Sequence, residues 1–475
     1  MEKSFLRKVL IIKLSYLSLS IAVNALILFI AMLVSGESFD DWIRVFTFIS
    51  LFQLVFNIIA LKVLGEEIFS LSNLFLIFSY LFHFGHVVLF FLQVDLDHQN
   101  VLITNSVSAE LLKKASEFTL FVQAFVAIGM MVNFIKPLKL DVAAHYPIGR
   151  NQVAHYMGII CVLIGLGPMI YIDITKVMAF LQNGYLATFE LEVSNIYILA
   201  RLTIVGIMLI IVANRESTKL ATILVAITVL YEVFSMFSGG RGKAVVTILA
   251  TIYLYTKVIK KVRLRIFLTY FVFGYFLINI INTIREFRLT SGDINSFVRI
   301  LSNQNLFNPF IDIVYEFGGT MLTVCFSILY FPQHVPIQWG TNYLFSVFTW
   351  LPSSIGNLEY FIDKVQYITF FPGTTEKFMG GSYIGELYYS FNLYGIGMAI
   401  FVGLFISFIS RKIREGIVFY SPLRIVLGII LFSNMLWWVR DYFGSMLREV
   451  FWIALFLFGL KLIVTYFVYR KNYPV

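Results

Sequence analysis

The sequence predicts an all-α fold, a polytopic bundle of transmembrane helices. Of its 475 residues, 59% are hydrophobic and only 13% are charged, whereas soluble domains average about 45–50% apolar and about 25% charged residues. Apolar runs of the length needed to span a bilayer, about 20 residues, recur along the chain. Short loops that are rich in Lys and Arg separate many of these runs. We therefore expect a single integral membrane domain over residues 1–475.

About 12 spans are predicted from the apolar runs. They lie near residues 14–34, 45–61, 71–92, 118–135, 153–172, 196–213, 220–237, 244–255, 266–284, 387–409, 425–439 and 450–468. A long external loop, residues 285–385, separates the ninth span from the tenth. Its apolar segments 317–330 and 343–350 are short and bounded by prolines, so we expect re-entrant or interfacial helices, with a further pair of spans as the alternative.

The distribution of Lys and Arg predicts the orientation, because cytoplasmic loops carry an excess of both. The alternating basic loops place both termini in the cytoplasm; they contain Lys3, Arg7, Lys8, Lys136, Lys139, Arg150, Arg215, Lys219, Lys257, Lys260, Lys261, Arg263, Arg265, Arg411, Lys412, Arg414, Arg470 and Lys471. Membrane orientation thus accounts for most of the net charge of +9, and no nucleic-acid partner is expected. Two cysteines, Cys161 and Cys325, support neither a disulfide framework nor a zinc site.

Six arginines lie at or near the predicted external ends of helices, where the orientation rule does not require them. One interpretation is interfacial snorkelling or ion pairing. The other is a cationic cluster that binds an anion at the outer leaflet. The six are Arg201, Arg241, Arg285, Arg288, Arg440 and Arg448.

The most informative local motif is the glycine-rich turn Ser238-Gly239-Gly240-Arg241-Gly242 between two predicted spans. Its glycines allow backbone N–H groups to converge as an anion-binding nest, and Arg241 adds a planar fork of donors. A purely steric role for the glycines is the alternative. Arg285 and Arg288, three residues apart, would share a helix face and clamp one phosphate, or form a charged interfacial collar.

Three external carboxylates are candidates for a general base: Glu386 first, then Asp441 and Glu316. Glu386 stands at the mouth of a predicted span, where burial would favour proton uptake. Asp441 lies next to Arg440 and would orient one of the neighbouring arginines. A structural ion pair with an arginine is the alternative for each carboxylate.

Other charged and polar groups favour structural roles. Glu232 lies inside the seventh predicted span, and Arg201 has a similar depth in the neighbouring span, so we expect them to pair. His83 and His86 have no third metal ligand nearby, which favours a packed, hydrogen-bonded pair over a metal site. The acidic pair Asp40-Asp41 is a weak signal for a divalent cation, and no metal or other cofactor is expected.

Four motifs together resemble the Wzy-type O-antigen and capsular oligosaccharide repeat unit polymerases. They are the Ser-Gly-Gly-Arg-Gly turn, the segment Glu316-Phe317-Gly318-Gly319, the run from Gly381 to Tyr388 with the spacing Gly-Ser-x-x-x-Glu-x-Tyr, and Arg440-Asp441-x-x-Gly444. The resemblance covers most of the chain and is most persuasive from about Tyr231 to Arg448. The family often has Ser at the third position of the turn, where this chain has Gly240.

The resemblance implies a membrane glycosyltransferase similar to the GT-C class, in the bacterial cytoplasmic (inner) membrane, with its active site facing outward. Donor and acceptor would be undecaprenyl-pyrophosphate-linked oligosaccharides for O-antigen, capsule or exopolysaccharide synthesis, with a flippase and a chain-length regulator as further partners. Without a metal, arginines would stabilise the leaving pyrophosphate. The implied pyrophosphate-binding residues are Arg241, Arg285, Arg288, Arg440, Arg448, Gly239 and Gly240, and the implied catalytic carboxylates are Glu386, Asp441 and Glu316.

Three alternative functions remain open from the sequence. A flippase or transporter of the same lipid-linked oligosaccharide would need charged residues along a path through both leaflets. An O-antigen-ligase-like transferase would move finished glycan to another acceptor. A metal-dependent transferase would use the Asp40-Asp41 pair.

Overall fold

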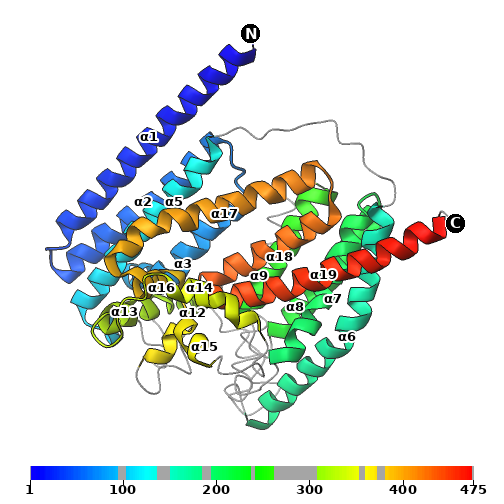
Figure 1. Ribbon diagram of the computed structural model, residues 1–475. Coiled ribbons are helices and arrows are strands. Elements are labelled where there is room, and N and C mark those ends of the chain that lie inside the picture. Colours follow the sequence, from blue (N-terminus) through cyan, green and yellow to red (C-terminus); the bar gives the residue numbers. More distant parts are fainter. Residues whose placement is uncertain are drawn as a thin grey trace. The chain divides into compact units, whose positions relative to one another are not determined.

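The computed structural model describes residues 2–94, 103–135, 150–183, 194–236, 241–260, 308–351, 359–371 and 380–472 (Figure 1). All regular elements in these ranges are helices, and 11 of them are long and apolar enough to cross a membrane. The predicted all-α, polytopic helix bundle is therefore confirmed. The ninth predicted span, near residues 266–284, lies outside the described residues, as do residues 285–307, the part of the predicted external loop before Asn308.

The chain divides into two compact units. The first comprises residues 1–140, 313–412 and 434–448, and the second comprises residues 141–312, 413–433 and 449–475. Three helices contribute residues to both units: α17 (Gly395–Val418), α18 (Pro422–Trp438) and α19 (Phe443–Asn472).

In the first unit, four long helices pack against one another: α1 (Glu2–Val34), α2 (Phe39–Leu64), α3 (Leu71–Phe91) and α5 (Ala109–Phe134) (Figure 1). Serine side chains cap three of the helix starts, because a hydroxyl oxygen accepts from an otherwise unpaired backbone N–H. Ser38 accepts from the amide of Asp41, and Ser70 and Ser108 cap α3 and α5 in the same way. Inside the bundle, the amide groups of Asn24 and Asn57 join α1 to α2 at 2.9 Å.

The segment predicted as re-entrant begins with α12 (Asn308–Gly318) and α13 (Met321–Tyr330), which are separated by Gly319 and Thr320. Residues Ile313–Tyr330 form one of the 11 candidate spans, by their length and composition. The second predicted segment is short, with α14 (Thr341–Phe345) followed by a 3-10 turn, Ser346–Trp350. The predicted span near residues 387–409 starts in α16 (Tyr383–Phe391) and continues in α17 after a break at Asn392, whose φ is +52°.

Helix α5 approaches α17 closely at two glycines. A Cβ atom on Gly129 would overlap the carbonyl oxygen of Ile400, and one on Gly403 would overlap the carbonyl oxygen of Val126. Small residues permit such close backbone contact, which is a main source of helix association in lipid.

Replacing Gly403 with Leu is therefore expected to force α5 and α17 apart and to lower the free energy of unfolding by about 1–3 kcal/mol. Thermal unfolding in detergent micelles measures this as a lower melting temperature. Gly397→Leu is the matched control, because Gly397 lies on the same helix and a Cβ atom added there would meet nothing within 4 Å. Equal melting temperatures for the two variants would contradict the packing argument.

The second unit contains α6 (Arg150–Asn183), α7 (Ser194–Ala213), α8 (Thr218–Ser235) and α9 (Arg241–Leu254). Helices α6 and α7 share a long interface, and α8 packs against both α7 and α9 (Figure 1). Gly158 and Gly206 let the backbones of α6 and α7 approach, since a Cβ on Gly158 would lie 2.8 Å from the Gly206 carbonyl oxygen. These four helices surround a cavity that is lined by five charged residues.

Candidate active site

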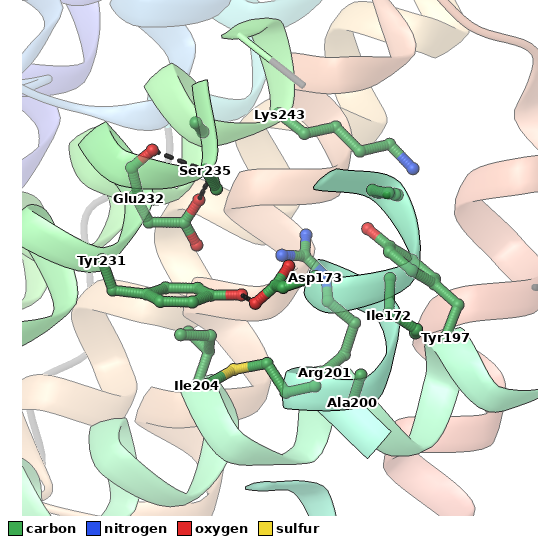
Figure 2. A pocket seen from close by; sticks show the side chains of 13 residues that line it. Ile172, Asp173, Tyr197, Ala200, Arg201, Ile204, Tyr231, Glu232, Ser235 and Lys243 are labelled. Carbon is green, nitrogen blue, oxygen red and sulfur yellow. Dashed lines mark hydrogen bonds between the residues drawn. The ribbon is translucent and has the colours of Figure 1, made fainter. Parts of the chain in front are cut away.

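A cavity of about 190 Å³ lies among α6, α7, α8 and α9 of the second unit (Figure 2). Its lining combines three cations, two carboxylates and three hydroxyl groups within candidate membrane-spanning helices. The charged residues are Asp173, Lys176, Arg201, Glu232 and Lys243, and the hydroxyl-bearing residues are Tyr197, Tyr231 and Ser235. Charged groups within membrane-spanning helices are costly and usually mark functional sites.

Helical spacing brings these side chains to the cavity. Tyr197 and Arg201 are four residues apart on α7, and Glu232 and Ser235 are three apart on α8, so each pair shares one helix face. Asp173 and Lys176 have the same relation on α6. Apolar residues such as Ile172, Ala200 and Ile204 complete the lining, so the polar groups lie in a partly apolar cavity.

The cations are held in defined positions. The Arg201 Nε atom donates to Glu449 at 3.1 Å, and its Nη1 donates to the Thr247 hydroxyl at 3.5 Å. The Arg201 guanidinium lies 5.6 Å and the Lys243 ammonium 4.9 Å from the centre of the Tyr197 ring, within the range of cation–π attraction. One edge of the guanidinium is therefore fixed by Glu449, while the residue also lines the cavity (Figure 2).

The acidic groups have unequal environments. The Tyr231 hydroxyl donates to Asp173 Oδ2 at 2.7 Å, and Asp173 also interacts electrostatically with Lys176. The Glu232 side chain is buried, and its carboxylate receives a long hydrogen bond of 3.5 Å from the Ser235 hydroxyl. The charges of Arg201 and Lys176 attract the Glu232 carboxylate, and the charge of Asp173 repels it. The expected pairing of Arg201 with Glu232 is present as an electrostatic interaction. The hydrogen-bonded ion pair of Arg201 is with Glu449, a residue for which no role was expected from the sequence.

A cavity with fixed cations next to carboxylates and hydroxyls suits a ligand that has both an anionic part and free hydroxyl groups. Phosphorylated sugars have this combination. Guanidinium and ammonium groups donate charge-assisted hydrogen bonds to phosphate, and carboxylates accept from sugar hydroxyls.

A family model, O-antigen polysaccharide polymerase Wzy, matches residues 16–472, nearly the whole chain. The chain belongs to the O-antigen polysaccharide polymerase Wzy family. No curated protein and no solved structure matches it. Membership confirms the resemblance seen in the sequence: this is a multi-span membrane protein that polymerises O-antigen repeat units, and its substrate is a lipid-linked oligosaccharide.

Several residues that the resemblance to Wzy polymerases implicated lie outside the described residues. These are Gly239, Gly240, Arg285 and Arg288. The backbone of Arg241 begins α9, but its side chain is not described. Along the chain, residues 237–240 connect α8 to α9, two helices that line the cavity through Ser235 and Lys243.

The other Wzy candidates lie in the first unit, and some of them are brought together. Arg440 lies 3.9 Å from Glu316 across an ion pair, with both side chains about one-third exposed. The Asp441 carboxylate accepts from the Trp437 indole and the Ser445 hydroxyl, each at 2.9 Å. Arg448 is half-buried on α19.

Glu386 is completely buried in the first unit. Its Oε2 atom accepts from the Trp438 indole at 3.0 Å and from the Phe443 backbone amide at 3.1 Å, and the Asn342 amide lies 3.5 Å from Oε1. Nearby, burial and the Glu386 charge hold the pKa of the Tyr367 hydroxyl well above its usual range. Tyr367 therefore stays protonated and donates to the Ser382 carbonyl at 2.9 Å.

Sequence reasoning missed most of the cavity. Asp173, Lys176, Tyr197 and Lys243 were not recognised as site residues, and Tyr231 was named only as the start of the resemblance. The available signal was a charged residue inside an apolar run with a second polar residue three or four positions away. His83 and His86 follow the prediction of packed, hydrogen-bonded side chains, to the Ser382 hydroxyl and the Tyr315 carbonyl respectively.

Proposed function

We propose that this Wzy-family polymerase is a membrane glycosyltransferase that joins undecaprenyl-pyrophosphate-linked repeat units, and that the second unit's cavity binds the donor pyrophosphate. The observation that carries the proposal is the cluster of Lys176, Arg201 and Lys243 in one cavity formed by membrane-spanning helices. The distribution of Lys and Arg in the loops supports a site on the outer face of the cytoplasmic membrane with both termini inside.

The proposed chemistry requires stabilisation of a leaving group. Transfer of the growing chain from its lipid carrier breaks the bond between the anomeric carbon and the pyrophosphate, and negative charge develops on the departing oxygen. Preorganised cations in a low-dielectric site stabilise such charge effectively. Tyr197 and Glu449 hold the Arg201 guanidinium before substrate arrives, so little reorganisation is needed.

Five further arginines are candidates for contacts with the substrate. Arg241, with Gly239 and Gly240, lies just before Lys243 in the chain, separated from it by Gly242, and would add donors next to the cavity. Arg285, Arg288, Arg440 and Arg448 stay candidates for contacts with the pyrophosphate or with lipid headgroups. The described residues contain no group of three or more His, Cys, Asp or Glu side chains that would hold a metal ion.

Purified protein incubated with a single lipid-linked repeat unit is expected to produce a ladder of polymers that differ by one unit, in EDTA as well as without it. Gel separation of the labelled glycans measures this. Lys243→Ala is expected to reduce the ladder strongly, whereas Lys219→Ala should leave it unchanged, since Lys219 is exposed at the opposite end of α8 from Ser235. Translocated but unextended substrate would instead indicate a flippase, and loss of the ladder in EDTA would indicate a metal-dependent enzyme.

A further inference from the structure

We propose that Glu232 is the general base that accepts the proton of the attacking sugar hydroxyl. This inference rests on the proposed function of the cavity, and it assigns a second part of the substrate, the acceptor hydroxyl, to the acidic side of the same cavity. Glu232 lines the cavity from α8, one residue after Tyr231 and three before Ser235.

Glu232 is a buried carboxylate with spare acceptor capacity. It is 5% exposed, and among the residues that the structure describes its carboxylate has one hydrogen-bond donor, the Ser235 hydroxyl at 3.5 Å. That hydroxyl also donates at the shorter distance of 2.8 Å to the Glu232 backbone carbonyl. A buried carboxylate normally accepts several hydrogen bonds or forms an ion pair. Glu232 has fewer such contacts than this, so its carboxylate oxygens can accept a hydrogen bond from a ligand.

The neighbouring carboxylates are already engaged. Asp173 accepts from the Tyr231 hydroxyl at 2.7 Å, and Glu449 pairs with Arg201 at 3.1 Å. Glu386 in the first unit has its Oε2 atom occupied by the Trp438 indole and the Phe443 amide. Of these acids, Glu232 is the one that combines a place in the cavity wall with a weakly engaged carboxylate.

The cavity is also polarised in a way that fits a two-substrate reaction. Figure 2 shows Glu232 and Tyr231 on one side, Lys243 and Tyr197 on the other, and the Arg201 guanidinium between them. A donor whose pyrophosphate lies near Lys243 and Arg201 would present its anomeric carbon toward the Glu232 side. An acceptor hydroxyl hydrogen-bonded to Glu232 would then face that carbon, as a general base requires.

In the proposed step, the acceptor oxygen forms a bond to the anomeric carbon of the donor chain. The bond from this carbon to the pyrophosphate oxygen breaks, and its electron pair leaves with undecaprenyl pyrophosphate. The hydroxyl proton passes to the Glu232 carboxylate and is later released to water. Arg201 also limits the cost of holding the Glu232 negative charge before the reaction, through their electrostatic interaction.

The test is the variant Glu232→Gln, which keeps the shape of the side chain but removes the basic oxygen. We expect the rate of polymer formation to fall by about 10²- to 10⁴-fold, while binding of undecaprenyl pyrophosphate in micelles stays equal to wild type. Glu216→Gln is the matched control, because Glu216 is an exposed carboxylate in the same unit. Azide, which attacks without losing a proton, should restore release of undecaprenyl pyrophosphate in Glu232→Gln.

Each other outcome has a definite meaning. Full polymerisation by Glu232→Gln, with an active wild type, would overturn the role of Glu232 and leave the proposed function standing. Loss of both polymerisation and undecaprenyl pyrophosphate binding, or the absence of any effect of azide, would show a structural role instead of catalysis. A wild-type protein that neither binds undecaprenyl pyrophosphate nor extends the lipid-linked unit would overturn both proposals.

Discussion

Arg201→Ala is expected to lower the rate of polymer formation by about 10²- to 10³-fold, the effect typical of losing one preorganised donor to a developing negative charge. Arg201 lines the cavity while Glu449 and Thr247 hold the Nε and Nη1 atoms of its guanidinium. Arg201→Lys should recover only part of the rate, since an ammonium keeps the charge but loses the planar fork. Initial rates of ladder formation from purified variants measure both effects.

Arg201→Ala also breaks the ion pair with Glu449, so a structural explanation needs its own control. The double variant Arg201→Ala/Glu449→Ala removes both members of the pair and should recover part of the melting temperature, because breaking a buried pair from one side costs more than replacing both members. We expect this double variant to stay inactive. Recovery of activity in the double variant would show that Arg201 acts only through packing. Arg44→Ala, at an exposed site on α2, is the control for the loss of an arginine.

The sequence was sufficient for the fold class, because lipid imposes a simple rule. Every backbone polar group inside a bilayer must be paired, so apolar runs of about 20 residues become helices. The break at Asn392 was beyond this rule, since it depends on one residue with a positive φ inside a continuous apolar run. The sequence also did not predict the interruption at Gly319 and Thr320 between α12 and α13.

The cavity was only partly predictable, because periodicity places a residue on a helix face and does not tell which helix the face meets. Arg201 and Glu232 were recognised as unusual, yet the direct ion pair of Arg201 is with Glu449, nearly 250 positions away in the chain. Lys243 reaches the cavity because α9 packs against α8. Such convergence depends on tertiary packing of helices that look alike in hydropathy.

Glu386→Ala is expected to destabilise the protein strongly. The carboxylate accepts from the backbone amide of Phe443, the first residue of the 30-residue helix α19, and from the Trp438 indole at the end of α18. The Glu386 side chain thereby satisfies one of the N–H groups that have no partner within the first turn of a helix. Each of the two donors left unpaired costs about 1–3 kcal/mol, so the free energy of unfolding should fall by about 2–6 kcal/mol.

Thermal unfolding in micelles tests this, with Glu110→Ala as the control at an exposed carboxylate on α5 of the same unit. Glu386→Gln should lose less stability than Glu386→Ala, because its amide oxygen still accepts from Trp438 or Phe443. Glu386→Gln also distinguishes between the two candidates for the general base, Glu386 from the sequence and Glu232 from the structure. A stable Glu386→Gln protein that makes polymer would assign Glu386 to holding α18 and α19 together, whereas a stable but inactive one would favour the base predicted from the sequence over Glu232.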